Sequence, residues 1–108
     1  MYNLQDAAMI QLGQLGSGLL DLNATTFTPP SGKVVVAITM LTDCAFDATT
    51  GLIADGGTGT YINTAGAGAS GVAVDSSNVF PKGVTIYGRW TSLSVNTDAE
   101  TCICYLGD

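Results

Sequence analysis

The 108-residue sequence contains no histidine and only three cations, Lys33, Lys82 and Arg89. Without histidine the chain alone cannot build a Ser-His-Asp or Cys-His nucleophilic site, and it lacks the commonest neutral metal ligand. Nine acidic residues bring the net charge to −6, which argues against the basic patch that nucleic acids require and against an anionic membrane surface. We therefore predict no enzymatic activity, no cofactor, no metal, and neither a nucleic-acid nor a membrane partner.

Charged residues of either sign are scarce, at 11% of the chain, whereas soluble domains typically contain about 25%. One interpretation is a quiet β domain whose surface is built from Thr, Ser, Asn and Gly. The interpretation that we favour is a single domain whose faces are covered by copies of itself or by a larger assembly.

The sequence shows neither a basic region before an apolar segment, as in a signal peptide, nor the roughly 20 apolar residues of a membrane span. Its three cysteines include no Cys-x-x-Cys pair. Cys102 and Cys104 share one face of a predicted strand and are poorly placed to bond each other. We predict three buried, reduced thiols and synthesis in a reducing cytosol, with a link from Cys44 to Cys102 or Cys104 as the open alternative.

The segment 80–107 has the clearest strand pattern. Apolar and polar residues alternate over 84–91 and again over 101–106, and residues 96–100 between them form a link of hairpin length. We therefore predict a long C-terminal hairpin. Its core-facing residues are Val84, Ile86, Trp90, Cys102, Cys104 and Leu106. Trp90 is interpreted as a core anchor rather than a sugar-binding platform, and Arg89 as paired with a carboxylate.

The other segments support an all-β fold. Residues 33–42 form a near-continuous apolar run, which indicates a central strand covered on both faces. A short strand is expected over 19–27. Residues 51–78 are interpreted as a long glycine-rich loop with a little strand near 60–63 and 72–74. The prediction is one antiparallel β-sandwich or jelly-roll-like domain over 19–108, preceded by an extended N-terminal arm or edge segment over 1–18.

Three groups of residues look reactive but fit other roles better. The carboxylate pairs Asp43 with Asp47 and Asp98 with Glu100 lie in turn-like sequence, where acids cap loops. The residues between Asp43 and Asp47 do not fit a calcium-binding loop. The glycine-rich stretch 56–60 lacks the lysine of a phosphate-binding loop.

Three pieces of the C-terminal region, FPKGVTIYG, RWTSLSV and TCICYLG, resemble the C-terminal hairpin of small virion structural proteins of tailed phages, in particular marine and cyanophage types. The upstream run VVVAITMLTDCAFD is similar to their central strand. The resemblance implies a β-rich virion component, assembled in the host cytoplasm. Most specifically it implies a capsid decoration or cement protein that binds and stabilises the major capsid lattice.

The resemblance also implies a partner, the major capsid protein or another virion protein, and a homo-oligomer, with a trimer favoured. Six residues are candidate partner-binding residues: Leu4, Met9, Ile10, Leu12, Tyr87 and Arg89. Two alternatives remain open. One is a tail, neck or fibre-associated virion component, and the other is a glycan- or ligand-binding β module, which would require Trp90 or Tyr87 to be exposed.

Overall fold

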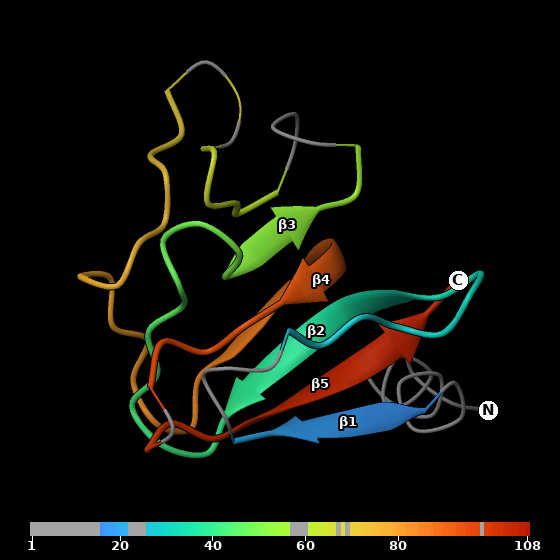
Figure 1. Cartoon of the computed structure of the whole chain (residues 1–108), viewed down its shortest axis with the longest axis horizontal. Helices are drawn as coiled ribbons and strands as arrows, with labels where there is room; N and C mark the ends of the chain where they lie inside the picture. Colours follow the sequence, from blue (N-terminus) through green and yellow to red (C-terminus); the bar gives the residue numbers. More distant parts are fainter. Residues whose placement is uncertain (1–15, 22–25, 57–60, 67, 69, 98) are drawn as a thin grey trace, which may run out of the picture.

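The computed structural model describes residues 16–21, 26–56, 61–66, 68, 70–97 and 99–108. Its strands form one antiparallel sheet in the order β1-β5-β2-β4-β3 (Figure 1). The strands are β1 (Ser17–Leu20), β2 (Val34–Met40), β3 (Leu52–Ala54), β4 (Thr85–Leu93) and β5 (Cys102–Gly107). The described part of the chain contains no helix. The predicted all-β, antiparallel single domain is confirmed.

Strand β2 is central, as its apolar run predicts. It pairs with β4 on one side and with β5 on the other. Five of its seven residues are buried, with the burial pattern BBiBBiB along the strand. A strand that is apolar on both faces is stabilised most when it has neighbours on both edges and cover on both sides, and this position provides the neighbours.

The predicted C-terminal hairpin is wrong, because β2 lies between β4 and β5. The link that follows β4 pairs instead with the segment after β2. Val95 is bridged to Phe46, and the Asn96 amide donates to the Ala45 carbonyl at 3.0 Å. A β4–β5 hairpin would have left β2 at the edge of the sheet, with a row of unpaired backbone groups beside its apolar side chains.

Strand β4 changes partners along its length, which lets one sheet enclose a core. Its first half pairs with β2, and Leu93 near its end pairs with both Leu52 of β3 and Phe27. Register shifts occur opposite β2 between Val35 and Ala37 and opposite β3 between Ile53 and Ala54. Such bulges sharpen the bend of a strand, and Figure 1 shows β4 curling over at its bend. The core cluster accordingly joins buried residues of β1, β2, β4 and β5 with Leu52 and Ala54 of β3 and with loop residues such as Phe46 and Val95.

The core confirms five of the six core residues that we predict. Ile86, Trp90, Cys102, Cys104 and Leu106 are buried, whereas Val84 is 37% exposed. Val84 precedes β4, in a turn where its amide donates to the Pro81 carbonyl at 3.2 Å. Its carbonyl accepts from the Met40 amide at 2.9 Å, so pairing with β2 continues to Val84, but the side chain at this end of β4 is only partly covered.

Two predicted boundaries also change. The predicted boundary between the N-terminal arm (1–18) and the β domain (19–108) falls inside β1. The region 51–78, which was predicted to be a glycine-rich loop, contains strand β3 near its start. No strand is assigned to the described residues of 60–63 and 72–74, although the Val74 amide donates to the Asn63 carbonyl at 3.1 Å. Of the strand predicted over 19–27, residues 19–20 belong to β1 and Phe27 forms a bridge with Leu93, while residues 22–25 lie outside the described residues.

Candidate interaction surface

The face of the sheet opposite the core carries two rows of side chains, each crossing β1, β5, β2 and β4 in that order. The strand registers place Leu19, Ile103, Thr39 and Thr85 in one row, and Ser17, Tyr105, Ala37 and Tyr87 in the other. We call these eight residues the open face. The alternate residues of the same strands, such as Cys102, Cys104 and Ile38, point into the core.

The open face combines exposed apolar groups with a complete lack of charge. Leu19 of β1 is 62% exposed and Tyr87 of β4 is 68% exposed, at opposite ends of the two rows. Ile103 and Tyr105 are half-buried between them, while Ala37 has no exposed surface. The hydroxyls of Thr39 and Thr85 lie 2.8 Å apart and hydrogen-bond each other. Sheet faces exposed to water usually carry polar and charged residues, so this face has the character of a surface that becomes covered.

Charges gather beside the start of β2, the end of β5 and the middle of β4, where they pair with each other. The Lys33 ammonium lies 2.7 Å from the Asp108 carboxylate, and the hydrogen bond and charge of Lys33 lower the pKa of Asp108. The Arg89 guanidinium lies 3.4 Å from the Asp55 carboxylate and donates to the Asp108 backbone oxygen at 2.8 Å. The predicted pairing of Arg89 with a carboxylate is confirmed. These exposed pairs contribute little stability, but they leave this end of the sheet electrically balanced.

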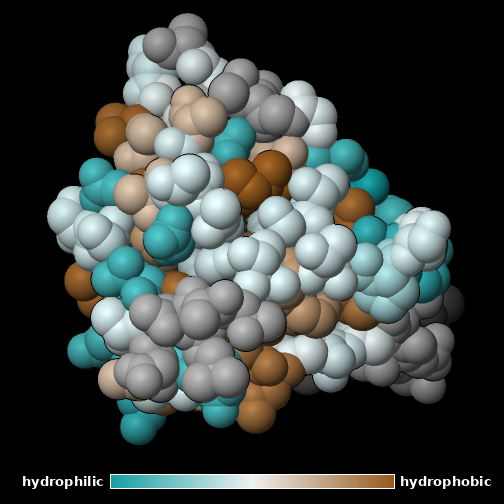
Figure 2. All heavy atoms as spheres, viewed as in Figure 1, coloured by the Kyte–Doolittle hydropathy of each residue, from teal (hydrophilic) through white to brown (hydrophobic). Residues whose placement is uncertain are grey.

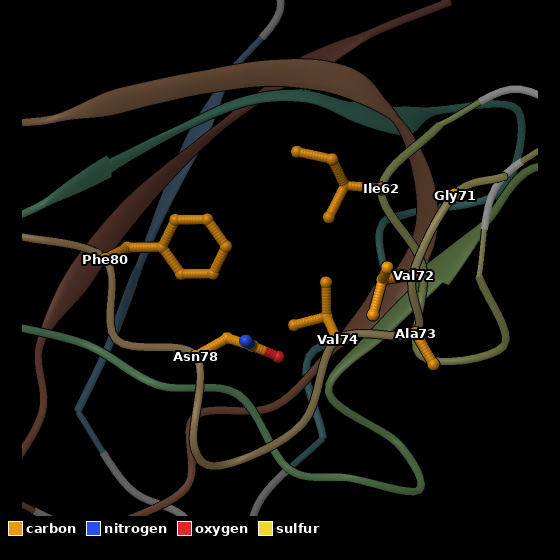
Figure 3. Close-up of a pocket in the computed structure, with 7 residues that line it drawn as sticks. All are labelled: Ile62, Gly71, Val72, Ala73, Val74, Asn78 and Phe80. Atoms are coloured by element: carbon orange, nitrogen blue, oxygen red, sulfur yellow. The ribbon is translucent and has the colours of Figure 1, made fainter.

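A shallow apolar hollow is lined by side chains from the loop segment that runs from Ile62 to Phe80 (Figure 3). Its volume is ≈ 360 Å³. The side chains of Phe80, Ile62 and Val74 point into it, and the side-chain oxygen Oδ1 of Asn78 accepts a hydrogen bond from the Asp75 backbone amide. The remaining lining residues are Gly71, Val72 and Ala73. The hollow can accept apolar groups but offers no nucleophile or titratable side chain.

The carboxylates that resembled reactive groups hold turns and links together. An Asp43 oxygen accepts from the Lys82 amide at 2.8 Å. Asp47 accepts from the amides of Thr50 and Thr49, and these bonds lower the pKa of Asp47. Asp98 lies outside the described residues. Within the described ranges no group of three or more His, Cys, Asp or Glu residues could hold a metal ion, and no helix is long and apolar enough to cross a membrane.

The three thiols are buried and free, as predicted, and no disulfide links Cys44 to its neighbours. The Cys44 thiol donates to the Thr101 and Thr42 carbonyls, each at 3.2 Å. Burial raises the pKa of Cys102 to about 12, with a further contribution from nearby Cys44, and burial raises the pKa of Cys104 to about 11. At neutral pH these thiols are protonated, and therefore poor nucleophiles.

The predicted partner-binding residues divide into three groups. Leu4, Met9, Ile10 and Leu12 lie outside the described residues. Tyr87 is exposed on the open face, whereas Arg89 is paired at the end of the sheet. Trp90 is fully buried and donates to the Ile62 carbonyl at 2.7 Å, so it is a core anchor and no platform for a sugar.

Sequence reasoning missed Leu19, Thr39 and Thr85 as surface candidates. The alternation in 101–106 did place Ile103 and Tyr105 opposite the cysteines, but only strand order shows that they share a face with Leu19 and Tyr87. On the side of the molecule that Figure 2 shows, apolar side chains form small, separate spots among polar ones. No protein-family model matches the chain, and no curated protein or solved structure is significantly similar to it.

Proposed function

We propose that this protein is a non-catalytic structural subunit of a tailed-phage virion, a capsid decoration protein that binds and stabilises the major capsid lattice. The observation that carries the proposal is the uncharged open face, on which Leu19 and Tyr87 are largely exposed. The resemblance of the sequence pieces FPKGVTIYG, RWTSLSV and TCICYLG to small virion proteins points to the same assignment.

An uncharged sheet face suits burial against another protein surface in an assembly. Covering Leu19 and Tyr87 removes apolar surface from water, which contributes roughly 25 cal/mol for each Å². No charge on the face has to be desolvated, which is the usual cost of closing a polar surface. The mutual hydrogen bond of Thr39 and Thr85 also leaves fewer polar groups that need a partner across the interface.

The exposed face does not favour a glycan-binding role. Glycan recognition combines an aromatic platform with polar side chains that bond the sugar hydroxyls. Tyr87 and Tyr105 supply aromatic rings, but the eight residues include no carboxylate, amide or guanidinium. The largest aromatic side chain, Trp90, is in the core.

The direct test is quantitative mass spectrometry of purified particles of the phage that encodes the chain. A capsid decoration protein is expected in a fixed ratio to the major capsid protein, with hundreds of copies per particle, because it occupies a repeated lattice site. A tail, neck or fibre component would instead be present in far fewer copies. Absence of the protein from intact particles would refute the virion assignment.

Binding to the lattice is tested with particles that lack the protein. The purified protein should bind them to saturation and raise the temperature at which they disrupt, because a ligand specific to the assembled state stabilises it. A basic protein of similar size serves as the control for electrostatic adsorption. Failure to bind such particles would contradict the decoration role.

A further inference from the structure

We infer that the open face pairs with the open face of a second copy of this chain, around a two-fold axis parallel to the strands. This inference rests on the proposed function only in taking the open face to be an interface. It identifies the partner across that face, and it leaves other surfaces, such as the apolar hollow, for the capsid.

The first support is the distribution of charge. Each chain carries a net charge of −6, so two copies repel each other through most approaches. The eight residues of the open face carry no charge, and the neighbouring Arg89 and Lys33 are balanced by Asp55 and Asp108. This face is therefore one through which two acidic copies can meet without bringing carboxylates together or burying an unpaired ion.

The second support is the order of large and small residues across the sheet. In the first row, from β1 to β4, two large side chains, Leu19 and Ile103, precede two small ones, Thr39 and Thr85. In the second row small and large residues alternate. The order there is Ser17, Tyr105, Ala37 and Tyr87.

A two-fold axis parallel to the strands, between β5 and β2, places β1 over the partner's β4 and β5 over the partner's β2. Each row then lies over the same row in reverse order. Leu19 faces the partner's Thr85, and Ile103 faces the partner's Thr39. In the second row Tyr105 faces the partner's Ala37, and Tyr87 faces the partner's Ser17. Every large side chain therefore meets a small one, as close packing of two sheets about 10 Å apart requires.

The other two-fold arrangement does not have this property. An axis perpendicular to the strands would place each strand over its own copy and exchange the two rows. Ile103 would then face the partner's Tyr105, and Thr39 would face the partner's Ala37. Two large residues would then clash in the middle of the contact, and two small residues beside them would leave a gap. The clash and the gap would each weaken the packing of the interface.

The size of the face limits the strength of pairing. Four strands spaced by about 4.8 Å, each contributing about four residues or roughly 13 Å of length, give a flat area of roughly 250 Å² per copy. Specific, stable complexes usually bury about 800 Å² per partner. We therefore expect a concentration-dependent dimer, with a dissociation constant on the order of 10 µM to 1 mM.

The test uses analytical ultracentrifugation of the wild-type protein from about 10 µM to 2 mM, a range set by the expected dissociation constant. A monomer–dimer equilibrium supports the inference. A monomer throughout this range, or the trimer predicted from the sequence, overturns it. Capsid binding is measured separately, so a dimer that does not bind particles refutes the proposed function alone, and a monomer that binds them refutes the pairing alone.

The pairing geometry is tested by introducing opposite charges at two positions that should face each other across the dimer. Leu19→Lys and Thr85→Glu should each weaken the dimer at least about tenfold, because each buries an unpaired charge. The double variant should recover affinity, because the new ammonium at position 19 of one copy then faces the new carboxylate at position 85 of the other. Within one chain, positions 19 and 85 are three strands apart, roughly 14 Å, too far for a direct ion pair.

Val79→Lys is the matched control, because Val79 is 59% exposed and belongs neither to the open face nor to the lining of the apolar hollow. It should leave the dissociation constant unchanged. Near-ultraviolet circular dichroism checks that every variant is folded. A double variant as weak as either single variant would overturn this geometry, and the wild-type measurement decides the dimer even if a variant fails to fold.

Discussion

The position of the Trp90 ring requires a glycine, Gly88, two residues earlier in the same strand. Its indole nitrogen donates to the Ile62 carbonyl at 2.7 Å, and its ring lies back over Gly88. A Cβ at position 88 would lie 2.7 Å from Cζ2 and 2.9 Å from Cη2 of Trp90. Gly88 is therefore required by the close approach of the ring at the bend of β4.

Gly88→Ala should lower the free energy of unfolding by about 1–3 kcal/mol, because a methyl group and an indole ring cannot share this space. Urea denaturation measures the loss. Trp90→Phe removes the outer ring that causes the overlap, so adding Gly88→Ala to that variant should cost clearly less. An equal cost in both backgrounds would show that the strain lies in the backbone rather than against Trp90.

The buried thiols make the stability of the protein depend on pH. The pKa values of Cys102 and Cys104 rise from 9.0 to about 12 and about 11 in the folded state. The folded chain therefore holds protons that the unfolded chain has released. This contribution to stability is complete below about pH 9 and is lost as the pH rises through the folded pKa values.

We expect the free energy of unfolding to fall between pH 9 and pH 11, measured by urea denaturation under reducing conditions. The Cys102→Ala/Cys104→Ala variant retains the tyrosines and lysines, so the difference between the two pH profiles isolates the thiols. The variant should show the shallower decline. Identical slopes would mean that thiol ionisation does not oppose folding.

At the scale of elements, the link between β4 and β5 is held by Glu100. One carboxylate oxygen accepts from the Ala45 amide at 2.7 Å, and the other accepts from the Thr97 amide at 2.8 Å. Both oxygens thus fasten the link to itself and to the segment after β2. This fixes the path by which the chain passes from the end of β4 to the start of β5.

Glu100→Ala should lower the free energy of unfolding by about 1–3 kcal/mol, because two backbone amides lose a charged acceptor. Glu100→Gln should cost less, since its amide oxygen retains one acceptor while its nitrogen cannot replace the other. Thermal unfolding of the two variants compares them directly. If the alanine variant were as stable as the glutamine variant, water would be an adequate substitute for the side chain.

The elements also show where prediction from sequence reaches its limit. The apolar run of β2 predicted its central position, and alternation predicted the buried face of β5. The same alternation could not reveal that β4 and β5 flank β2, since every strand offers the same backbone donors and acceptors. Strand β3 was missed because three residues amid glycine-rich sequence carry too short a pattern.

For the whole molecule, the relevant quantities are the net charge of −6 and the one sheet face without charge. If copies pair through that face, long-range repulsion opposes the pairing. Added salt screens this repulsion, while it leaves the uncharged contact itself largely intact.

Self-association of the wild-type protein should therefore strengthen by about two- to tenfold between 50 and 500 mM NaCl. Sedimentation equilibrium at each salt concentration measures it. The Leu19→Lys/Thr85→Glu variant serves as the comparison, because its added ion pair is itself screened and its gain should be smaller. Weaker wild-type association at high salt would indicate that ion pairs, rather than an uncharged face, hold the copies together.

Local sequence patterns were enough to predict the main strands, the apolar side of each strand, the burial of the thiols and the scarcity of charge. These properties follow from local alternation and composition, which act over a few residues. The strand order, the bend in β4 and the open face became visible only once the chain was folded. Each joins residues distant in the chain, as when Lys33 meets Asp108 or Trp90 meets Ile62, and such pairings depend on the packing of the whole sheet.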